Sequence, residues 1–549
     1  MTFTYDGGLV TEMAWSGVAN GTYRYRYDNN FSLVGMQLDD EPEIEMKRDA
    51  DGLLTQYGQF QVVRNLATGA PTQITDGKMN VDIEYDNSGR VISRTNLVNG
   101  RVIYQLQLSY DVLSRIVQKR ETVTGTTHIY DYTYDLDGQL ILVRRDSEVV
   151  ERYVYDDNGN RTEWQLGAQQ HTASYDAQDR LIELDGTPYE FDADGFLMQR
   201  GDMTLKYSAT GELLEVSWPD GKAINYTYDS MNRRVARTDK KGTEQYLYGN
   251  PNHPFPVTAM RDNSGKLSVY EYDDFGSLFS LKRDANLYYL VTDQLGTPRV
   301  VCDVNGRAIK VLDYNSFGQQ IADSNFLFDL PISFAGGLIE PDTKLVRFGF
   351  RDYDAVAAKW TAKDPIRFIG GDANLYSYVS NEPINFLDRQ GTDRLRFDIW
   401  AYYGLPGDGG KTNTFAYGTV SWINDQGKEI GLYPIISGQW GKGALPEGNY
   451  KITQGPIEYF DKTQDIYARC LDSVSGKSWW LAVKPTFKTT RGDFGFHPDG
   501  GTPGTAGCLG IPKGVDSSDL YQRFKDYDIS PNHPLYLDVV GPGSCQITR

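Results

Sequence analysis

Cysteine and histidine are scarce in this chain, whose 549 residues contain four Cys and five His. This scarcity excludes a disulfide-dense scaffold. The C-terminal part holds only His497 and His533 and no Cys-x-x-Cys pair, which is too few ligands for a zinc site. No glycine motif for nucleotides occurs either. We therefore expect no metal and no cofactor.

Long apolar runs and an excess of positive charge are also lacking. No stretch of eighteen apolar residues occurs, which predicts no membrane span. The first residues have neither a basic nor an apolar segment, so no secretory signal is visible. The net charge is −19, and an acidic surface repels phosphate backbones. Nucleic acid is therefore not an expected partner.

Tyrosine, in contrast, is abundant at 38 residues, and a Tyr-Asp or Phe-Asp repeat fills the first two thirds of the chain. The repeats follow one another at roughly sixteen to twenty-five residues. Each unit continues with a turn and an aliphatic strand. Examples are Tyr85-Asp-Asn-Ser-Gly-Arg-Val91, Tyr110-Asp-Val-Leu-Ser-Arg-Ile116, Tyr134-Asp-Leu-Asp-Gly-Gln-Leu140, Tyr155-Asp-Asp-Asn-Gly-Asn-Arg161 and Tyr228-Asp-Ser-Met-Asn-Arg-Arg234.

This pattern predicts an array of β-hairpins. The aromatic residue ends one strand, and Asp, Asn and Gly form the turn, because Asx side chains bond their own backbone and Gly accepts positive φ. One hairpin cannot bury its apolar face alone, so neighbouring hairpins must join into a long sheet. Such a sheet must spiral or close in order to protect its edges. We expect a mostly β fold.

The repeats resemble the YD repeats of rearrangement-hotspot (Rhs) proteins and of insecticidal toxin-complex C subunits. The segments Arg351-Asp-Tyr-Asp-Ala, Lys359-Trp-Thr-Ala-Lys-Asp-Pro365 and Asn381-Glu-Pro-Ile-Asn-Phe-Leu-Asp-Arg-Gln-Gly391 resemble the Rhs core-associated segment. The resemblance implies a β-cocoon shell over residues 1–345, a closing segment over 346–392, and a variable C-terminal toxin domain over 393–549.

The family pattern at this boundary ends in Asp-Pro-x-Gly-Leu, where the core cuts itself with paired aspartates. Asp364 and Asp388 match those aspartates, whereas Arg389 replaces Pro and Thr392 replaces Leu. Paired carboxylates that share a proton can catalyse hydrolysis. Self-cleavage near Thr392 is one interpretation, against which the change of Pro to Arg389 counts. In the other, Asp364 and Asp388 are turn formers.

After residue 392 the repeat stops, and a domain-sized region of β character follows. Runs at 412–423, 450–453, 478–483 and 535–540 are typical of strands, and residues 516–525 are typical of a helix. Trp479 and Trp480 are expected in the core. If the domain works in an oxidising compartment, we expect Cys470 to pair with Cys545, whereas reduced thiols are the alternative.

The segment from Phe496 to Ile511 contains a thiol and an imidazole, Cys508 and His497, in a stretch too rich in Gly and Pro for a helix. A folded-back segment can bring the two side chains together. A cysteine needs an adjacent base because little thiolate forms at neutral pH, and His497 can take and return the proton. Backbone N–H groups around Gly507 and Cys508 can hold an oxyanion.

The motifs Gly443-Ala-Leu-Pro-Glu-Gly-Asn-Tyr-Lys-Ile452 and Gly495-Phe-His-Pro-Asp-Gly-Gly-Thr-Pro-Gly-Thr-Ala-Gly-Cys-Leu-Gly-Ile511 resemble L,D-transpeptidases used as antibacterial effectors. The resemblance implies attack by Cys508 on the carbonyl before D-Ala in peptidoglycan stem tetrapeptides. Asp499 and Thr505 are candidate supporting residues, and both are also typical of turns. Ala506 departs from the family pattern, as does the absence of an Arg in 509–511. The outcome is hydrolysis, D-amino acid exchange or cross-linking.

We therefore expect an exported antibacterial toxin that acts in the periplasm of a target cell, with a cognate immunity protein and a secretion-system carrier as partners. Two alternatives stay open. The repeats could bind carbohydrate or a partner surface beside an inert C-terminal domain, or the domain could be a cysteine amidase that cuts another cell-wall bond.

Overall fold

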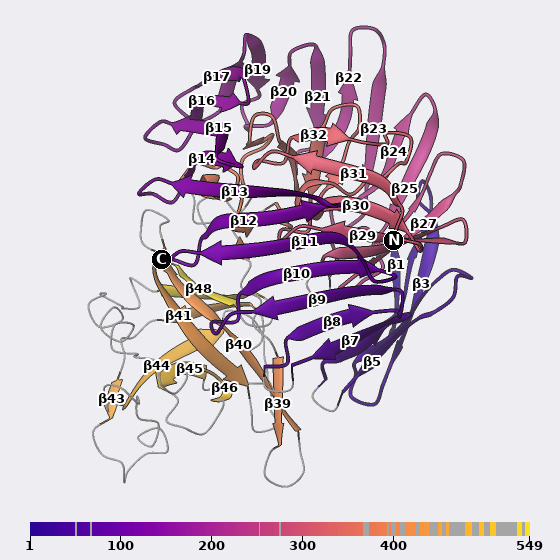
Figure 1. Ribbon diagram of the computed structural model, residues 1–549, viewed down its shortest axis with the longest axis vertical. Coiled ribbons are helices and arrows are strands. Elements are labelled where there is room, and N and C mark those ends of the chain that lie inside the picture. The colour runs from indigo at the N-terminus through magenta and orange to yellow at the C-terminus, as the bar shows by residue number, and fades with distance from the viewer. Residues whose placement is uncertain are drawn as a thin grey trace. The chain divides into compact units, whose positions relative to one another are not determined.

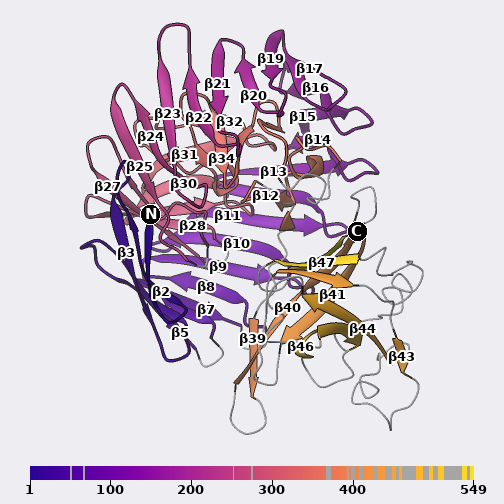
Figure 2. The ribbon, with the colours of Figure 1, turned by 180° about the vertical axis from the view of Figure 1, so that it is seen from behind.

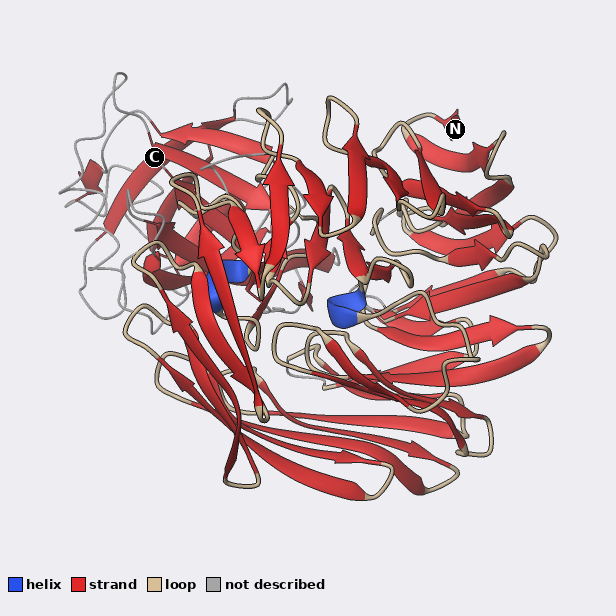
Figure 3. Ribbon diagram, turned by 90° about the horizontal axis from the view of Figure 1, so that it is seen from above, coloured by secondary structure: helices blue, strands red, loops and turns tan. Residues whose placement is uncertain are grey.

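A computed structural model describes residues 1–391 except 50–51, 66–67, 252, 274–275 and 366–372, and beyond them the backbone of the strands from 395 onward. The chain divides into two units. The first comprises residues 1–47, 56–63 and 72–397, and the second comprises 48–55, 64–71 and 398–549. Strands dominate the described residues, as Figure 3 shows, and the helical turns η1 (Phe334–Gly336) and η3 (Val379–Asn381) have three residues each. The expected mostly β fold is confirmed.

The described residues of the first unit form a 32-stranded sheet in which successive strands pair antiparallel (Figure 1). The strands are β1 (Thr2–Asp6), β2 (Leu9–Trp15), β3 (Gly21–Tyr27), β4 (Leu33–Leu38), β5 (Ile44–Arg48), β6 (Leu54–Tyr57), β7 (Phe60–Arg64), β8 (Pro71–Thr75), β9 (Met79–Tyr85), β10 (Val91–Val98), β11 (Arg101–Tyr110), β12 (Ile116–Val123), β13 (Thr126–Tyr134), β14 (Leu140–Arg145), β15 (Glu148–Tyr155), β16 (Arg161–Leu166), β17 (Gln169–Tyr175), β18 (Leu181–Leu184), β19 (Thr187–Phe191), β20 (Leu197–Arg200), β21 (Met203–Tyr207), β22 (Leu213–Ser217), β23 (Ala223–Tyr228), β24 (Arg234–Asp239), β25 (Gly242–Leu247), β26 (Ala259–Arg261), β27 (Leu267–Tyr272), β28 (Leu278–Arg283), β29 (Asn286–Thr292), β30 (Pro298–Asp303), β31 (Ala308–Tyr314) and β32 (Gln320–Asp323).

The Asp of each repeat builds the turn that joins two strands. Asp86 Oδ1 accepts the backbone N–H groups of Ser88 and Arg90, each at 2.9 Å, and Asp86 Oδ2 lies 2.7 Å from Arg90 Nε. The fourth turn residue, Gly89, has φ +81°, and its counterpart in the next repeat, Ser114, has φ +61°. The turn therefore needs a residue that tolerates the left-handed region, which explains the Gly, Asn and Asp content of the repeats.

The Arg and Tyr of successive repeats also bind one another. The Arg90 guanidinium lies 4.5 Å above the ring of Tyr110, and the Tyr110 hydroxyl donates to the carbonyl of Val91 at 2.7 Å. The next repeat does the same, with Arg115 over Tyr134 and the Tyr134 hydroxyl bonded to the carbonyl of Ile116. Each turn thereby anchors the strand that follows, combining a cation–π contact with a buried hydrogen bond.

The sheet curls so that strands far apart in sequence meet. Arg299 in β30 donates to Glu121 in β12 at 3.0 Å, and the Tyr25 hydroxyl in β3 donates to the carbonyl of Gly249 at 2.8 Å. Figure 1 shows the successive strands turning through this sheet. Because these pairs are not sheet neighbours, side chains from opposite parts of one sheet form a common interior, as the repeat pattern predicts.

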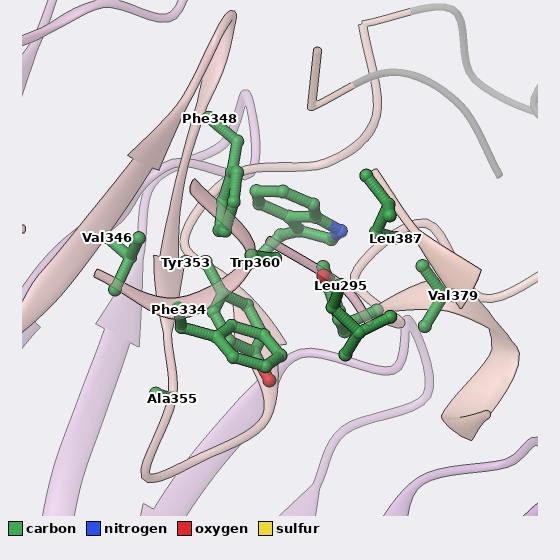
Figure 4. Packing of buried hydrophobic residues seen from close by; sticks show 11 residues of the cluster. Leu295, Phe334, Val346, Phe348, Tyr353, Ala355, Trp360, Val379 and Leu387 are labelled. Carbon is green, nitrogen blue, oxygen red and sulfur yellow. The ribbon is translucent and has the colours of Figure 1, made fainter. Parts of the chain in front are cut away.

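The closing segment forms a separate small sheet of β33 (Leu338–Ile339), β34 (Leu345–Phe348), β35 (Arg351–Asp354) and β36 (Lys359–Trp360), all antiparallel. Its apolar side chains join a buried aromatic cluster (Figure 4). The ring of Tyr353 lies 4.5 Å from that of Tyr378 and 5.5 Å from that of Trp360. A two-stranded sheet, β37 (Phe386–Leu387) and β38 (Leu395–Arg396), follows.

The second unit is a ten-stranded sheet, part of which is visible in Figure 2. Its strands are β39 (Tyr402–Pro406), β40 (Thr412–Ile423), β41 (Glu429–Gly438), β42 (Gly448–Ile452), β43 (Ile457–Tyr459), β44 (Ser478–Pro485), β45 (Phe494–Pro498), β46 (Thr505–Ile511), β47 (Leu535–Val540) and β48 (Ser544–Thr548). The four predicted strands are confirmed as β40, β42, β44 and β47. The predicted helix at 516–525 lies outside the described residues.

Candidate self-cleavage and acyl-transfer sites

Arg351, the first residue of β35, brings the two predicted aspartates together. Its Nη2 lies 2.7 Å from Asp364 Oδ2 and 3.3 Å from Asp388 Oδ2. Antiparallel pairing with β34 and β36 fixes the backbone of β35. The Arg351 guanidinium also lies 4.1 Å above the ring of Trp360 in the aromatic cluster. Strand pairing and the indole ring therefore hold the guanidinium in place.

The peptide group of Gly391 lies against the same side chains. Asp388 Oδ1 accepts the Gly391 N–H at 2.7 Å, and Arg351 Nε donates to the Gly391 carbonyl oxygen at 2.5 Å. Gly391 has φ +70°, and a Cβ atom there would lie 2.5 Å from the carbonyl oxygen of Phe348. Only glycine fits this position. The Arg351 side chain, which is 4% exposed, polarises the Gly391 carbonyl.

The backbone on both sides of this site is paired. Phe350 donates its N–H to the carbonyl of Gln390 at 2.7 Å, and Asp364 donates its N–H to the carbonyl of Leu375 at 3.0 Å. Asp364 and Asp388 are 8% and 2% exposed. The site therefore places two shielded carboxylates, one guanidinium and one peptide carbonyl together, directly before Thr392, which lies outside the described residues.

Sequence reasoning identified the two aspartates but gave Arg351 no role, although the residue begins one of the motifs on which the Rhs resemblance rests. Arg351 precedes its partners by 13 and 37 residues, a separation that forms no recognisable local spacing. Arg389, which replaces Pro in the family pattern, is inserted into the shell. Burial lowers the pKa of its guanidinium, which the charge of Asp273 partly offsets.

The second candidate site lies on two neighbouring strands of the C-terminal sheet. β45 and β46 pair in parallel, with Phe496 opposite Leu509 and His497 opposite Gly510. Cys508 therefore stands two register positions from His497, on the adjacent strand. Cys508 itself directly precedes the residues of β46 that pair with β45. The segment from Phe496 to Ile511 thus folds back as two adjacent strands.

The register of β46 changes beside this position. On the other side, β41 pairs Ser437 with Leu509 and Gly438 with Thr505, so residues 506–508 are inserted between two pairings. Such irregularities re-aim side chains and are over-represented next to active sites. Thr505 and Gly507 also lie in β46. Asp499, Cys470 and His533 lie outside the described residues, while Cys545 lies in β48 and Trp479 and Trp480 lie in β44.

The fourth cysteine, Cys302, lies in β30 of the shell. It is fully buried, and burial raises the pKa of its thiol to about 12. Within the described residues, no cluster of His, Cys, Asp and Glu could hold a metal ion. No helix in the described part of the chain is long and apolar enough to cross a bilayer.

The repeat turns, the curled sheet and the closing segment define a YD-repeat shell protein. The family model described as Teneurin YD-shell matches residues 1–384, and the chain belongs to this family. Teneurin-3 of Danio rerio is 33% identical over 388 residues, which cover 67% of this chain. Teneurin-m of Drosophila melanogaster is 30% identical over 406 residues, which cover 70% of it. The chain spans only 14% and 15% of the length of these relatives.

Solved structures give the same fold. A crystal structure of TcdB2-TccC3-TEV superposes with a TM-score of 0.58 at 17% identity, over 68% of this chain and 21% of the other. A Photorhabdus luminescens Tc holotoxin pore gives a TM-score of 0.54 at 16% identity, over 72% of this chain and 21% of the other. At this identity the likeness concerns the fold of the shell alone.

Proposed function

We propose that this chain is a toxin in which a YD-repeat shell carries a C-terminal cysteine acyltransferase that modifies peptidoglycan. The observation that carries the proposal is the register of β45 and β46, which puts His497 and Cys508 on adjacent strands two positions apart. Residues on neighbouring strands near one register position are candidates for side-chain contact. The likeness of the shell to a Tc holotoxin component supports the toxin class.

In the proposed reaction, His497 takes the proton of the Cys508 thiol, and the thiolate attacks the carbonyl that precedes D-Ala in a stem tetrapeptide. The C–N bond breaks, and His497 returns the proton to the departing D-Ala amine. The resulting thioester passes its acyl group to water or to another amine. Backbone N–H groups near residues 507–508 hold the oxyanion.

Release of the enzyme by self-cleavage is the second part of the proposal. Asp364 and Asp388 flank the Gly391 peptide group through Arg351, and the guanidinium donates to its carbonyl oxygen. A water molecule activated by one carboxylate attacks this carbonyl, the Gly391–Thr392 bond breaks, and the amine of Thr392 receives the proton. The released domain then acts in the target-cell periplasm, after export by a dedicated carrier and opposed by a cognate immunity protein.

The test is to incubate the full chain with tetrapeptide muropeptides and to identify the products by mass spectrometry, before and after any self-cleavage. We expect loss or exchange of terminal D-Ala with wild type and none with Cys508→Ala. Cys302→Ala is the matched control, because this thiol is buried in the shell, and it should retain activity. Equal product formation by Cys508→Ala and wild type would contradict the proposal.

An interaction protein with an inert C-terminal domain is the second candidate. One observation favours it. The teneurin relatives, at 30–33% identity, and the matching family model both concern the shell, and the family model ends at residue 384. The muropeptide experiment separates the two functions, because a binding protein leaves D-Ala in place. A cysteine amidase would instead release a product of different mass from another bond.

A further inference from the structure

Four arginines surround a cavity in the shell that neither candidate reaction uses. The cavity has a volume of about 50 Å³, and the described residues that line it include four Arg and no Asp or Glu. The arginines are Arg233, Arg234, Arg347 and Arg389. Since one water needs a cavity volume of roughly 10–15 Å³, the cavity has room for a few waters or one small ion.

These arginines come from three separate parts of the shell. Arg234 is the first residue of β24 and Arg233 directly precedes it. Arg347 lies in β34, and Arg389 follows β37. The first three are 2%, 3% and 5% exposed. Such burial of several like charges costs free energy unless opposite charges compensate for them.

Buried carboxylates compensate for these charges, but two guanidiniums share one of them. Asp229 pairs with Arg233 at 2.7 Å, whereas Asp352 is shared by Arg234 and Arg347, each at 2.8 Å. Although burial raises it, the two guanidiniums hold the pKa of Asp352 below its ordinary value, so this carboxylate is ionised.

Asp273 is the acidic group that acts most strongly on Arg389. Glu212, which is 8% exposed, also lies within the electrostatic reach of Arg347. The four guanidiniums are therefore balanced in charge, and what remains open is their hydrogen bonding.

Hydrogen-bond donors remain unused. Arg234 bonds Tyr228 through Nε and Nη2 and Asp352 through Nη2, so its Nη1 has no partner among the described residues. Arg347 uses only Nη1, on Asp352, and its Nε and Nη2 are buried with no partner in the described part of the chain. Buried unsatisfied N–H groups are costly, and oxygens of an anion satisfy guanidinium donors well.

Arg389 closes the cavity by passing over a glycine. A Cβ atom at Gly276, whose φ is +70°, would lie 2.3 Å from Arg389 Nη1. The missing side chain at position 276 therefore makes room for the guanidinium. The closing segment delivers the fourth positive charge to the cavity through this contact.

We propose that this cavity binds a small oxyanion of one or two negative charges. The oxyanion accepts hydrogen bonds from the unused donors, and it links Arg389 of the closing segment to Arg233 and Arg234 at the beginning of β24. A compact phosphate, sulfate or carboxylate group has this chemistry. Apolar neighbours such as Phe255 and Val257 limit the ligand to that size.

The test is isothermal titration calorimetry of the full chain with inorganic phosphate, sulfate and acetate, against chloride at equal ionic strength. We expect a Kd below about 1 mM for at least one oxyanion. Arg389→Gln should weaken that binding by about tenfold or more. Arg283→Gln is the matched control, because Arg283 is also half-buried in the shell but lies outside the cavity, and it should bind as wild type does.

Tighter binding of phosphate and sulfate than of acetate would identify a tetrahedral ligand, and the reverse order would identify a carboxylate. Should Arg389→Gln not fold, as judged by circular dichroism, Arg389→Lys keeps the charge but loses the planar fork, and it should bind at least about threefold more weakly than wild type. The proposal is overturned if no oxyanion binds better than chloride, or if Arg389→Gln and Arg283→Gln bind equally well.

Discussion

Arg351 donates from Nε to the carbonyl oxygen of Gly391 over 2.5 Å, so a buried cation polarises the last described peptide before residue 392. The same guanidinium binds Asp364 and Asp388. A structural turn needs no such convergence on one carbonyl. This relationship between Arg351 and Gly391 is the basis for proposing self-cleavage at this position.

Removal of a carboxylate should prevent cleavage. We expect purified wild type to show two fragments that meet at Gly391–Thr392, and Asp388→Asn to remain one chain, since the amide cannot activate water. Intact-mass spectrometry measures both. Asp137→Asn, at an exposed position of a repeat turn, is the control and should cleave as wild type does. An uncut wild-type chain would rule out this assignment.

Arg351→Lys should separate charge from geometry. Lysine keeps the positive charge but cannot contact both carboxylates and the Gly391 carbonyl with a planar fork. We expect the cleavage rate to fall by about 10²-fold or more, in the range seen when one oxyanion donor is removed. The measurement is the fraction cleaved over time by intact mass, with unfolding by urea as the control for stability. Cleavage at the wild-type rate would show that Arg351 is only structural.

The repeat turns predict a stability effect that depends on a single carboxylate. Asp111 accepts the N–H groups of Leu113 and Arg115 at 2.9 Å each, and Arg115 contacts its other oxygen. Asp111→Ala should lower the free energy of unfolding by about 1–3 kcal/mol. Val112→Ala in the same turn, at a fully exposed position, should change it by less than about 0.5 kcal/mol. Urea midpoints of the two variants are the measurement.

These turns also predict acid sensitivity. Burial raises the pKa of Asp86, Asp111 and Asp176, but hydrogen bonds from the turn and the Arg at the fifth position outweigh it, so the net pKa is lowered. A lowered native pKa contributes stability above the unfolded value of about 3.9, and that stability is lost as the pH falls further. We expect the urea concentration at the unfolding midpoint to decrease when the pH is lowered below about 4. The decrease should be less steep in Asp111→Ala. Parallel curves for the two proteins would contradict this cause.

Glu151 predicts the opposite dependence. Burial raises the pKa of its carboxyl group, although Ser316 and Tyr153 donate hydrogen bonds to it. A raised native pKa means that the folded state binds the proton more tightly, so stability falls as the pH rises through that pKa. Glu151→Gln, which stays neutral, should flatten the fall that begins above the ordinary Glu pKa of about 4.3. Denaturation curves at pH values above this pKa measure the effect.

The sequence predicted the hairpin turns well because their chemistry is local. Asp86 and Gly89 lie within four residues of each other, and their roles follow from Asx hydrogen bonding and positive φ. The contact of Arg90 with Tyr110 was not predicted, because it links consecutive repeats across a strand pair. The register between neighbouring strands decides such contacts, and this register cannot be inferred from the sequence of a single repeat.

The candidate sites divide in the same way. The motif that suggested a pairing of His497 with Cys508 is local in sequence, and the strands that contain them, β45 and β46, pair in parallel. Arg351 acquires its role only when β35 places it beside residues 13 and 37 positions later. The arginine cavity was not predicted at all, since Arg234, Arg347 and Arg389 meet only through the tertiary fold.

The most direct test of the proposed function is to incubate the full chain with tetrapeptide muropeptides, to quench the reaction rapidly, and to map the peptides of the protein. The account predicts a thioester-linked acyl group, the stem peptide without its terminal D-Ala, on the peptide that contains Cys508. Cys508→Ala should carry no adduct. An unmodified Cys508 peptide in a preparation that still removes D-Ala, or no reaction of wild type with any muropeptide, would contradict it.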